Sequence, residues 1–155
     1  MTGEECMRRA IALSEENVRS GGGPFAAVIV RVGVIVAEGA NRVTADNDPT
    51  AHAEVSAIRA ACRSLGTFTL SGCEIFTSCE PCPMCLGAIY WARISKIYYG
   101  NNRDDAARVG FDDDFIYKEI PLALESRSIP MQNLLRGEAL RCFNQWAAKS
   151  DKVEY

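Results

Sequence analysis

His52-Ala53-Glu54 and Pro81-Cys82-Pro83-Met84-Cys85 are the two stretches that decide the fold of this 155-residue chain. Together they offer one imidazole, two thiols and one carboxylate. A zinc ion held by one imidazole and two thiolates keeps its fourth tetrahedral position free for water, as catalytic zinc sites do. We therefore expect one Zn²⁺ per subunit, with His52, Cys82 and Cys85 as its ligands.

Both motifs are predicted to lie at the starts of helices. Apolar residues recur at helical spacing over residues 51–65, and Pro49 and Thr50 mark the start of that helix. Pro83 suits the first turn of a second helix over residues 83–91. Helix N-termini carry positive partial charge and lower the pKa of nearby thiols, which favours the thiolates that zinc requires. The metal is therefore expected where the two helix starts converge.

Glu54 is predicted to be the catalytic proton carrier. The spacing H-x-E…P-C-x-x-C is typical of zinc deaminases that act on nucleobases, in which the glutamate moves protons and does not bind the metal. Positioned acid and base catalysis of this kind contributes roughly a hundred- to ten-thousand-fold. The alternative is a non-catalytic, structural zinc module with Cys79 as fourth ligand, but such a closed site leaves Glu54 without a role.

The order of the expected elements indicates the fold class. A capped helix is followed by a hairpin, and each zinc-motif helix is then followed by a strand. The expected helices cover residues 4–20, 51–65, 83–91, 114–119 and 138–149, and the expected strands cover 25–31, 34–38, 73–77, 94–100 and 129–135. This alternation predicts a three-layer α/β/α sandwich around a central mixed five-stranded sheet, in one domain over residues 1–155.

Composition argues against several other classes of protein. The net charge of -3 gives no overall basic field, so no nucleic-acid partner is expected. The sequence shows neither a charged-then-apolar leader nor an apolar run long enough to cross a bilayer. The seven cysteines are an odd number, which disfavours a disulfide framework. A cytoplasmic protein without a membrane partner is expected.

Three longer segments resemble one family. Residues 47–54 read NDPTAHAE, residues 77–93 read TSCEPCPMCLGAIYWAR, residues 110–120 read GFDDDFIYKEI, and the chain ends at Tyr155. Together they resemble the bacterial guanine deaminases of the cytidine deaminase-like fold. The zinc motifs alone are shared with cytosine, cytidine and tRNA adenosine deaminases, so the guanine assignment depends on residues 110–120.

The resemblance implies an activity and an assembly. It implies zinc-dependent hydrolytic deamination of guanine to xanthine and ammonia, in purine catabolism or salvage. Guanosine deamination and then tRNA adenosine deamination are the alternatives within the family. It also implies a homodimer in which a C-terminal tail of about residues 137–155 is swapped, so that Tyr155 of one subunit covers the pocket of its partner. A frayed chain end is the other interpretation of Tyr155.

Several further residues are candidates for substrate binding. The resemblance implies that Asp113 contacts guanine, whose N1–H and C2 amino group are donors that a carboxylate accepts. An acidic turn that caps the next helix is the alternative. Asn41 resembles the asparagine that binds substrate in this fold, although it could also be a turn residue. Phe25 and Trp91 could stack on the purine, or they could belong to the core or a subunit interface.

Overall fold

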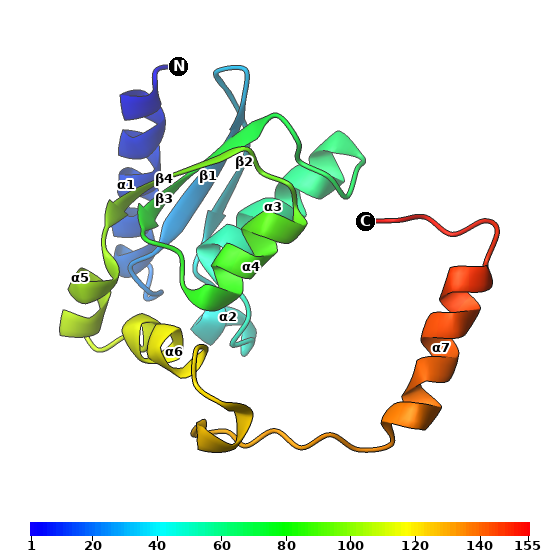
Figure 1. The fold of residues 1–155 in the computed structure, drawn as a ribbon. Coiled ribbons are helices and arrows are strands. Elements are labelled where there is room, and N and C mark those ends of the chain that lie inside the picture. Colours follow the sequence, from blue (N-terminus) through cyan, green and yellow to red (C-terminus); the bar gives the residue numbers. More distant parts are fainter.

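The computed structural model describes all 155 residues and arranges them around one mixed sheet (Figure 1). None of its helices combines the length and the apolar character that a bilayer span requires. The elements are α1 (Gly3–Arg19), β1 (Ala26–Arg31), β2 (Val34–Ala40), α2 (Val43–Asp46), α3 (Ala53–Leu65), β3 (Cys73–Cys79), α4 (Pro83–Trp91), β4 (Lys96–Asn101), α5 (Arg103–Arg108), α6 (Asp113–Glu119), a 3₁₀ turn (Leu124–Ser126) and α7 (Arg136–Ala148).

The sheet has the strand order β2-β1-β3-β4. Strand β1 pairs antiparallel with both β2 and β3, whereas β3 and β4 run parallel. The predicted hairpin is confirmed, and both residues of its turn have positive φ, 49° at Val32 and 72° at Gly33. Such φ values match the twist of the flanking strands and are typical of two-residue hairpin loops. The α/β class and the mixed sheet are thus as expected.

Two separate cores hold the helices on the two faces of the sheet. On one face, helix α1 packs through Cys6 and Ala10 against Val28 and Phe76 of the sheet. On the other face, α3 and α4 share a larger cluster, in which the fully buried side chains of α3 are small ones such as Ala57 and Ala61. Small side chains let a helix approach the sheet closely, which fixes the height of the α3 N-terminus above the strands.

The prediction of a fifth strand over residues 129–135 is wrong for the single chain. These residues have no regular structure, and the chain leads through them away from the sheet to α7 (Figure 1). None of the residues of α7 is buried. A strand forms only where another strand pairs with its backbone, and within one chain this segment does not reach the free edge of β4. The sheet consequently has four strands instead of five.

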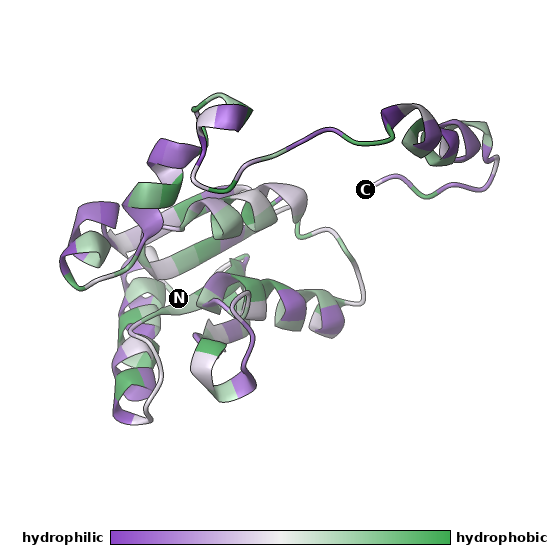
Figure 2. Ribbon diagram, turned by 90° about the horizontal axis from the view of Figure 1, so that it is seen from below, coloured by the Kyte–Doolittle hydropathy of each residue, from purple (hydrophilic) through white to green (hydrophobic).

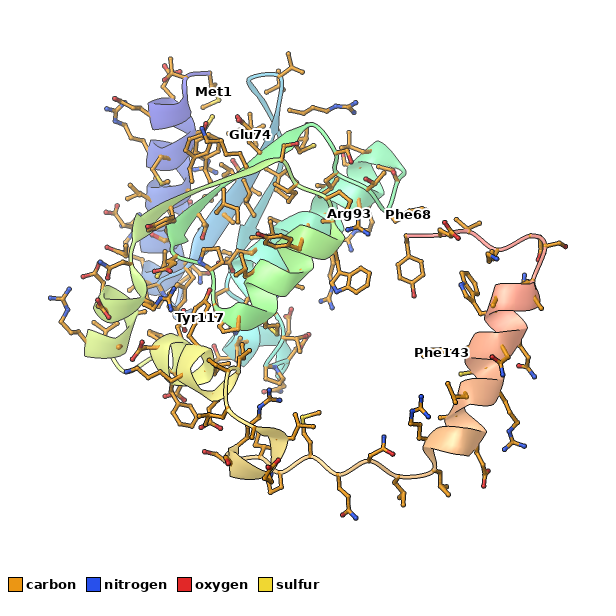
Figure 3. The ribbon with its side chains drawn as sticks, in the orientation of Figure 1. Met1, Phe68, Glu74, Arg93, Tyr117 and Phe143 are labelled. Atoms are coloured by element: carbon orange, nitrogen blue, oxygen red, sulfur yellow. The ribbon has the colours of Figure 1, made fainter.

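Helix α7 has an apolar side without a partner in its own chain. Phe143 and Trp146 are exposed, and Figure 2 shows hydrophobic residues along the helix although nothing covers it. Figure 3 places Phe143 on the detached helix, far from the body of the domain. A helix with this pattern normally buries its apolar stripe against another element. The exposed stripe is therefore a contact surface that the isolated chain leaves open.

Gly39 on β2 fixes the distance between the sheet and α3. A Cβ at Gly39 would overlap the carbonyl oxygen of Ala53 and lie 2.5 Å from the amide nitrogen of Ala57. We expect Gly39→Ala to destabilise the fold by about 1–3 kcal/mol, because the backbone of α3 must move. Thermal unfolding measures the change. Gly87→Ala is the matched control, since a Cβ at Gly87 meets nothing within 4 Å. An unchanged Tm for Gly39→Ala would contradict the close contact between β2 and α3.

Candidate active site

The two sequence motifs meet at the N-termini of α3 and α4. His52 is the N-cap residue of α3 and has extended backbone angles, so its ring reaches a site beyond the end of that helix. Cys82 is the N-cap residue of α4, with Pro83 in the first turn, and its Sγ lies 3.5 Å from the backbone N–H of Cys85. The expected convergence of two helix starts is therefore what the structure has.

The three predicted metal ligands form one cluster. Their candidate ligand atoms all lie within 4.8 Å of one another. Nδ1 of His52 is 3.5 Å from Sγ of Cys82 and also 3.5 Å from Sγ of Cys85. Zn–N and Zn–S bonds of ordinary length at a tetrahedral angle separate nitrogen and sulfur by about 3.6 Å. The donor set and its spacing thus fit a zinc ion that keeps one position open.

Cys79 stands apart from this cluster. Its thiol is buried and donates to the carbonyl oxygen of Asn102 at 3.8 Å. Burial raises its pKa to about 12, and the carboxylates of Asp113 and Glu54 act in the same direction. Cys79 is also not among the residues whose ligand atoms come together in the metal cluster. The site therefore lacks the fourth sulfur ligand of a closed structural centre.

The two ligand cysteines shift the pKa values of each other in opposite directions. The side chain of Cys85, together with His52, lowers the pKa of Cys82 to about 4. The same contact, with burial, raises the pKa of Cys85. The hydrogen bond to Cys82 also raises the pKa of His52. Zinc must displace the protons of these side chains to bind, because it is held by two thiolates and a neutral imidazole.

Glu54 lies in the first turn of α3 and is buried. Its Oε1 accepts a hydrogen bond of 3.2 Å from the hydroxyl of Thr77 on β3. Burial raises the pKa of the Glu54 carboxyl. A carboxyl with a raised pKa accepts and releases a proton nearer neutral pH than an exposed one, which suits a group that moves protons.

A small cavity joins these groups to most of the predicted substrate-binding residues. It is lined by Phe25, Asn41, His52, Glu54, Glu80, Cys82 and Asp113. Asp113 begins α6, and its pKa is raised by burial and by the neighbouring Cys82. Asn41 also acts as a turn residue, because its Oδ1 accepts from the backbone of Val43 at 3.2 Å. Glu80 is a residue of this cavity that the sequence analysis did not single out.

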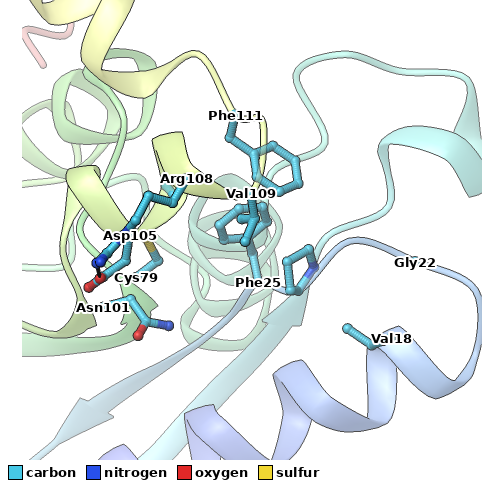
Figure 4. Close-up of a pocket in the computed structure, with 11 residues that line it drawn as sticks. Val18, Gly22, Phe25, Cys79, Asn101, Asp105, Arg108, Val109 and Phe111 are labelled. Carbon is cyan, nitrogen blue, oxygen red and sulfur yellow. Dashed lines mark hydrogen bonds and ion pairs between the residues drawn. The ribbon is translucent and has the colours of Figure 1, made fainter.

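A second cavity, of about 630 Å³, shares Phe25 with the first as a lining residue (Figure 4). Phe25 and Phe111 form an edge-to-face pair with ring centroids 4.7 Å apart, and both rings line this second cavity. Its wall also includes Asp105 and Arg108 but none of the three metal-ligand candidates. The smaller cavity is therefore the candidate active site, because His52 and Cys82 of the metal cluster and Glu54 line it.

Trp91 and Tyr155 lie outside the cavity of their own chain. Trp91 ends α4, about 13 Å along the helix axis from Cys82 at the helix rise of 1.5 Å per residue. The rings of Trp91 and Tyr155 are 6.0 Å apart, and both are largely exposed. They line an apolar depression over α3 and α4. Neither residue lines the cavity that holds His52 and Glu54 in the same chain.

Comparisons with known proteins give a consistent result. Residues 1–101 match the family model of the cytidine and deoxycytidylate deaminase zinc-binding region. The chain is 54% identical to guanine deaminase from Bacillus subtilis, with all of both chains covered. The crystal structure of guanine deaminase from that organism superposes with a TM-score of 0.96, covering 100% of this chain and 99% of that chain.

More distant relatives share part of the chain. A solved structure of guanine deaminase from Nitrosomonas europaea is 31% identical, with a TM-score of 0.70, and the match covers 90% of this chain and 73% of that one. A tRNA-specific adenosine deaminase from Agrobacterium fabrum is 47% identical over 77 residues, about half of each protein. The match to the guanine deaminase from Bacillus subtilis covers the whole length of the chain, tail included.

Proposed function

Because the chain belongs to the cytidine and deoxycytidylate deaminase zinc-binding family, we infer that it is a zinc-dependent hydrolase that converts guanine to xanthine and ammonia. The observation that carries this function is the cluster of His52, Cys82 and Cys85 beside buried Glu54, in a chain that matches a guanine deaminase over its full length. A purine base is accordingly the substrate.

We propose the following roles for the residues of the active site. His52, Cys82 and Cys85 hold zinc, which when bound lowers the pKa of a water molecule and so supplies a nucleophile near neutral pH. Glu54 takes one proton from that water and passes it to N3 of guanine, while the water oxygen bonds to C2. It then takes the remaining proton of that oxygen and gives it to the amino group at C2, so that the C–N bond breaks, ammonia leaves and C2 becomes a carbonyl of xanthine. The hydroxyl of Thr77 holds the Glu54 carboxylate in place through both transfers.

Asp113, Asn41 and Phe25 are proposed to bind the purine. Asp113 accepts from N1–H and from the C2 amino group of guanine, whereas adenine would turn the lone pair of its N1 toward the carboxylate. The amide of Asn41 donates and accepts at another edge of the base. Phe25 offers an aromatic face, and stacking on such a face is worth roughly 1–3 kcal/mol per base. All three side chains line the cavity.

We further propose a homodimer that exchanges its C-terminal segments. Strand β4 is an open edge of the sheet, and residues 129–135 are a strand-like segment without a partner. Beside β4, an apolar groove lined by Met7, Phe76 and Tyr98 is uncovered. Residues 129–135 of a second subunit would pair along β4 as a fifth strand, and its α7 would fill the groove.

The similarity to Bacillus subtilis guanine deaminase supports this exchange. The match to its crystal structure has a TM-score of 0.96 and covers 100% of this chain, so it includes the extended segment and α7 as well as the core. Tyr155 at the end of the exchanged segment is proposed to cover the zinc cavity of the partner subunit, with Trp91 beside it. We place the enzyme in the cytoplasm, where two cysteines remain reduced to bind zinc.

Ammonia release from a panel of bases tests the function. Zinc-loaded protein is offered guanine, guanosine, adenine and cytosine at equal concentrations, and ammonia is measured in a coupled assay. We expect guanine to react far faster than the other three, and we expect a chelator to abolish the reaction until zinc is restored. Faster release from guanosine would assign the nucleoside instead, and no release from any of the four would refute the proposed function.

A further inference from the structure

A chain of contacts links the zinc loop to the helix that carries Asp113. Glu80, in the wall of the active-site cavity, accepts from Arg103 at both carboxylate oxygens, from the backbone N–H at 2.8 Å and from the guanidinium at 2.9 and 3.1 Å. The guanidinium of Arg103 lies 3.8 Å from the centre of the Tyr117 ring. The hydroxyl of Tyr117 donates to the carbonyl oxygen of Pro81 at 2.6 Å.

These contacts attach α6 to the residues that hold the metal. Pro81 directly precedes Cys82. Tyr117 and Asp113 are four residues apart in α6 and so share one face of the helix. Figure 3 shows Tyr117 on the part of the molecule where α6 meets the start of α4. The hydroxyl of Tyr117 thus fixes the distance between the metal loop and the carboxylate of Asp113.

Helix α6 packs against α5 and α4, but few polar contacts hold it in this place. The helix has only seven residues and none of them is buried. Its N-cap residue, Asp112, makes no capping hydrogen bond with its side chain. A short, exposed helix has low stability of its own and takes its position from tertiary contacts. The short bond from Tyr117 to Pro81, supported by the stacked Arg103, is consequently the main polar anchor of α6.

We propose that Tyr117 is a positioning residue for base selection, held in place by the Glu80–Arg103 pair. It touches neither the substrate nor the metal, but it holds Asp113 at the edge of the purine that presents N1–H. This inference rests on the proposed function, because it needs guanine as the substrate. It gives Glu80, Arg103 and Tyr117 a role in selecting the base. Neither the zinc-binding motif nor the metal site requires these residues.

Tyr117→Phe tests the proposal, because it removes the hydroxyl and leaves the ring beneath Arg103. We expect KM for guanine to rise about tenfold with little change in kcat, since a hydrogen bond to a charged group is weakened in the complex. The preference for guanine over 2-aminopurine should fall by a similar factor, because 2-aminopurine has the reacting amino group but no N1–H. Zinc content should not change.

A double-mutant cycle with Asp113→Asn separates positioning from a purely structural role. If Tyr117 acts through Asp113, Tyr117→Phe should have almost no further effect on KM in the Asp113→Asn background. Equal effects in both backgrounds, or a lower Tm with unchanged kinetics, would overturn the proposal. Tyr90→Phe is the matched control, since the side chain of Tyr90 is 70% exposed. Inactivity of the wild type on guanine would refute the function itself, before any variant is compared.

Discussion

Glu54→Gln should lower the rate of guanine deamination by roughly a hundred- to ten-thousand-fold while zinc stays bound. Glutamine has the shape of glutamate and still accepts a hydrogen bond from Thr77, so the site keeps its geometry. Its amide cannot take a proton from water or deliver one to the purine. Steady-state rates measure the loss, and metal analysis of the purified variant measures the zinc.

Cys79→Ser is the informative comparison for Glu54→Gln. Because the thiol of Cys79 contacts Asn102 and not the metal cluster, this variant should also retain zinc, and it should remain active. Loss of zinc from Cys79→Ser would indicate a closed structural site with four ligands. A Glu54→Gln enzyme with wild-type turnover would refute the role of Glu54, and loss of zinc from it would mean that the carboxylate is a ligand.

A mixture of two impaired variants should recover activity if the C-terminal segments are exchanged. Glu54→Gln subunits have an inactive core and an intact tail, whereas Tyr155→Ala subunits have an intact core and a defective tail. In an exchanged heterodimer, the intact tail covers the intact core and makes one working site. Random pairing of equal amounts puts such heterodimers in half of the population, so activity should reach about a quarter of the wild-type value.

Co-expression is needed for this experiment, because exchanged segments separate slowly once the dimer has formed. The control is a simple mixture of the two separately purified variants, which should stay near the sum of their own activities. If each tail folds back on its own core, co-expression adds nothing, since every intact core keeps a defective tail. The mass of the wild-type protein in solution then decides independently between monomer and dimer.

The sequence predicted the cluster of metal ligands, because the signal there is local. Metal ligands have a fixed chemistry, and a spacing of only two residues between Cys82 and Cys85 places both at the start of one helix, so the pattern specifies its own geometry. The hairpin at Val32-Gly33 is equally local. Helix α5 is marked by a capping box at Asn102 and Asp105, but its six residues are too few for a periodic pattern, and it was not predicted.

Features that depend on distant contacts could not be predicted in this way. Residues 129–135 have the composition of a strand, but whether a strand forms depends on which edge lies within reach, and the single chain provides none. Trp91 lies at the end of α4 that is far from Cys82, because the helix runs away from the metal site. The sequence motif around Cys82 and Cys85 does not specify this direction. The contact between Glu80 and Arg103 joins residues 23 apart, and only the fold brings them together.

The exposed C-terminal segment also affects the lifetime of the protein in a cell. Proteases cut most readily where the backbone is extended and free of regular structure, and residues 127–135 are such a segment in the single chain. A chain that has folded but has not yet met a second copy is therefore open to cleavage between its intact core and α7. Its survival would depend on how soon it is paired as well as on the stability of the core.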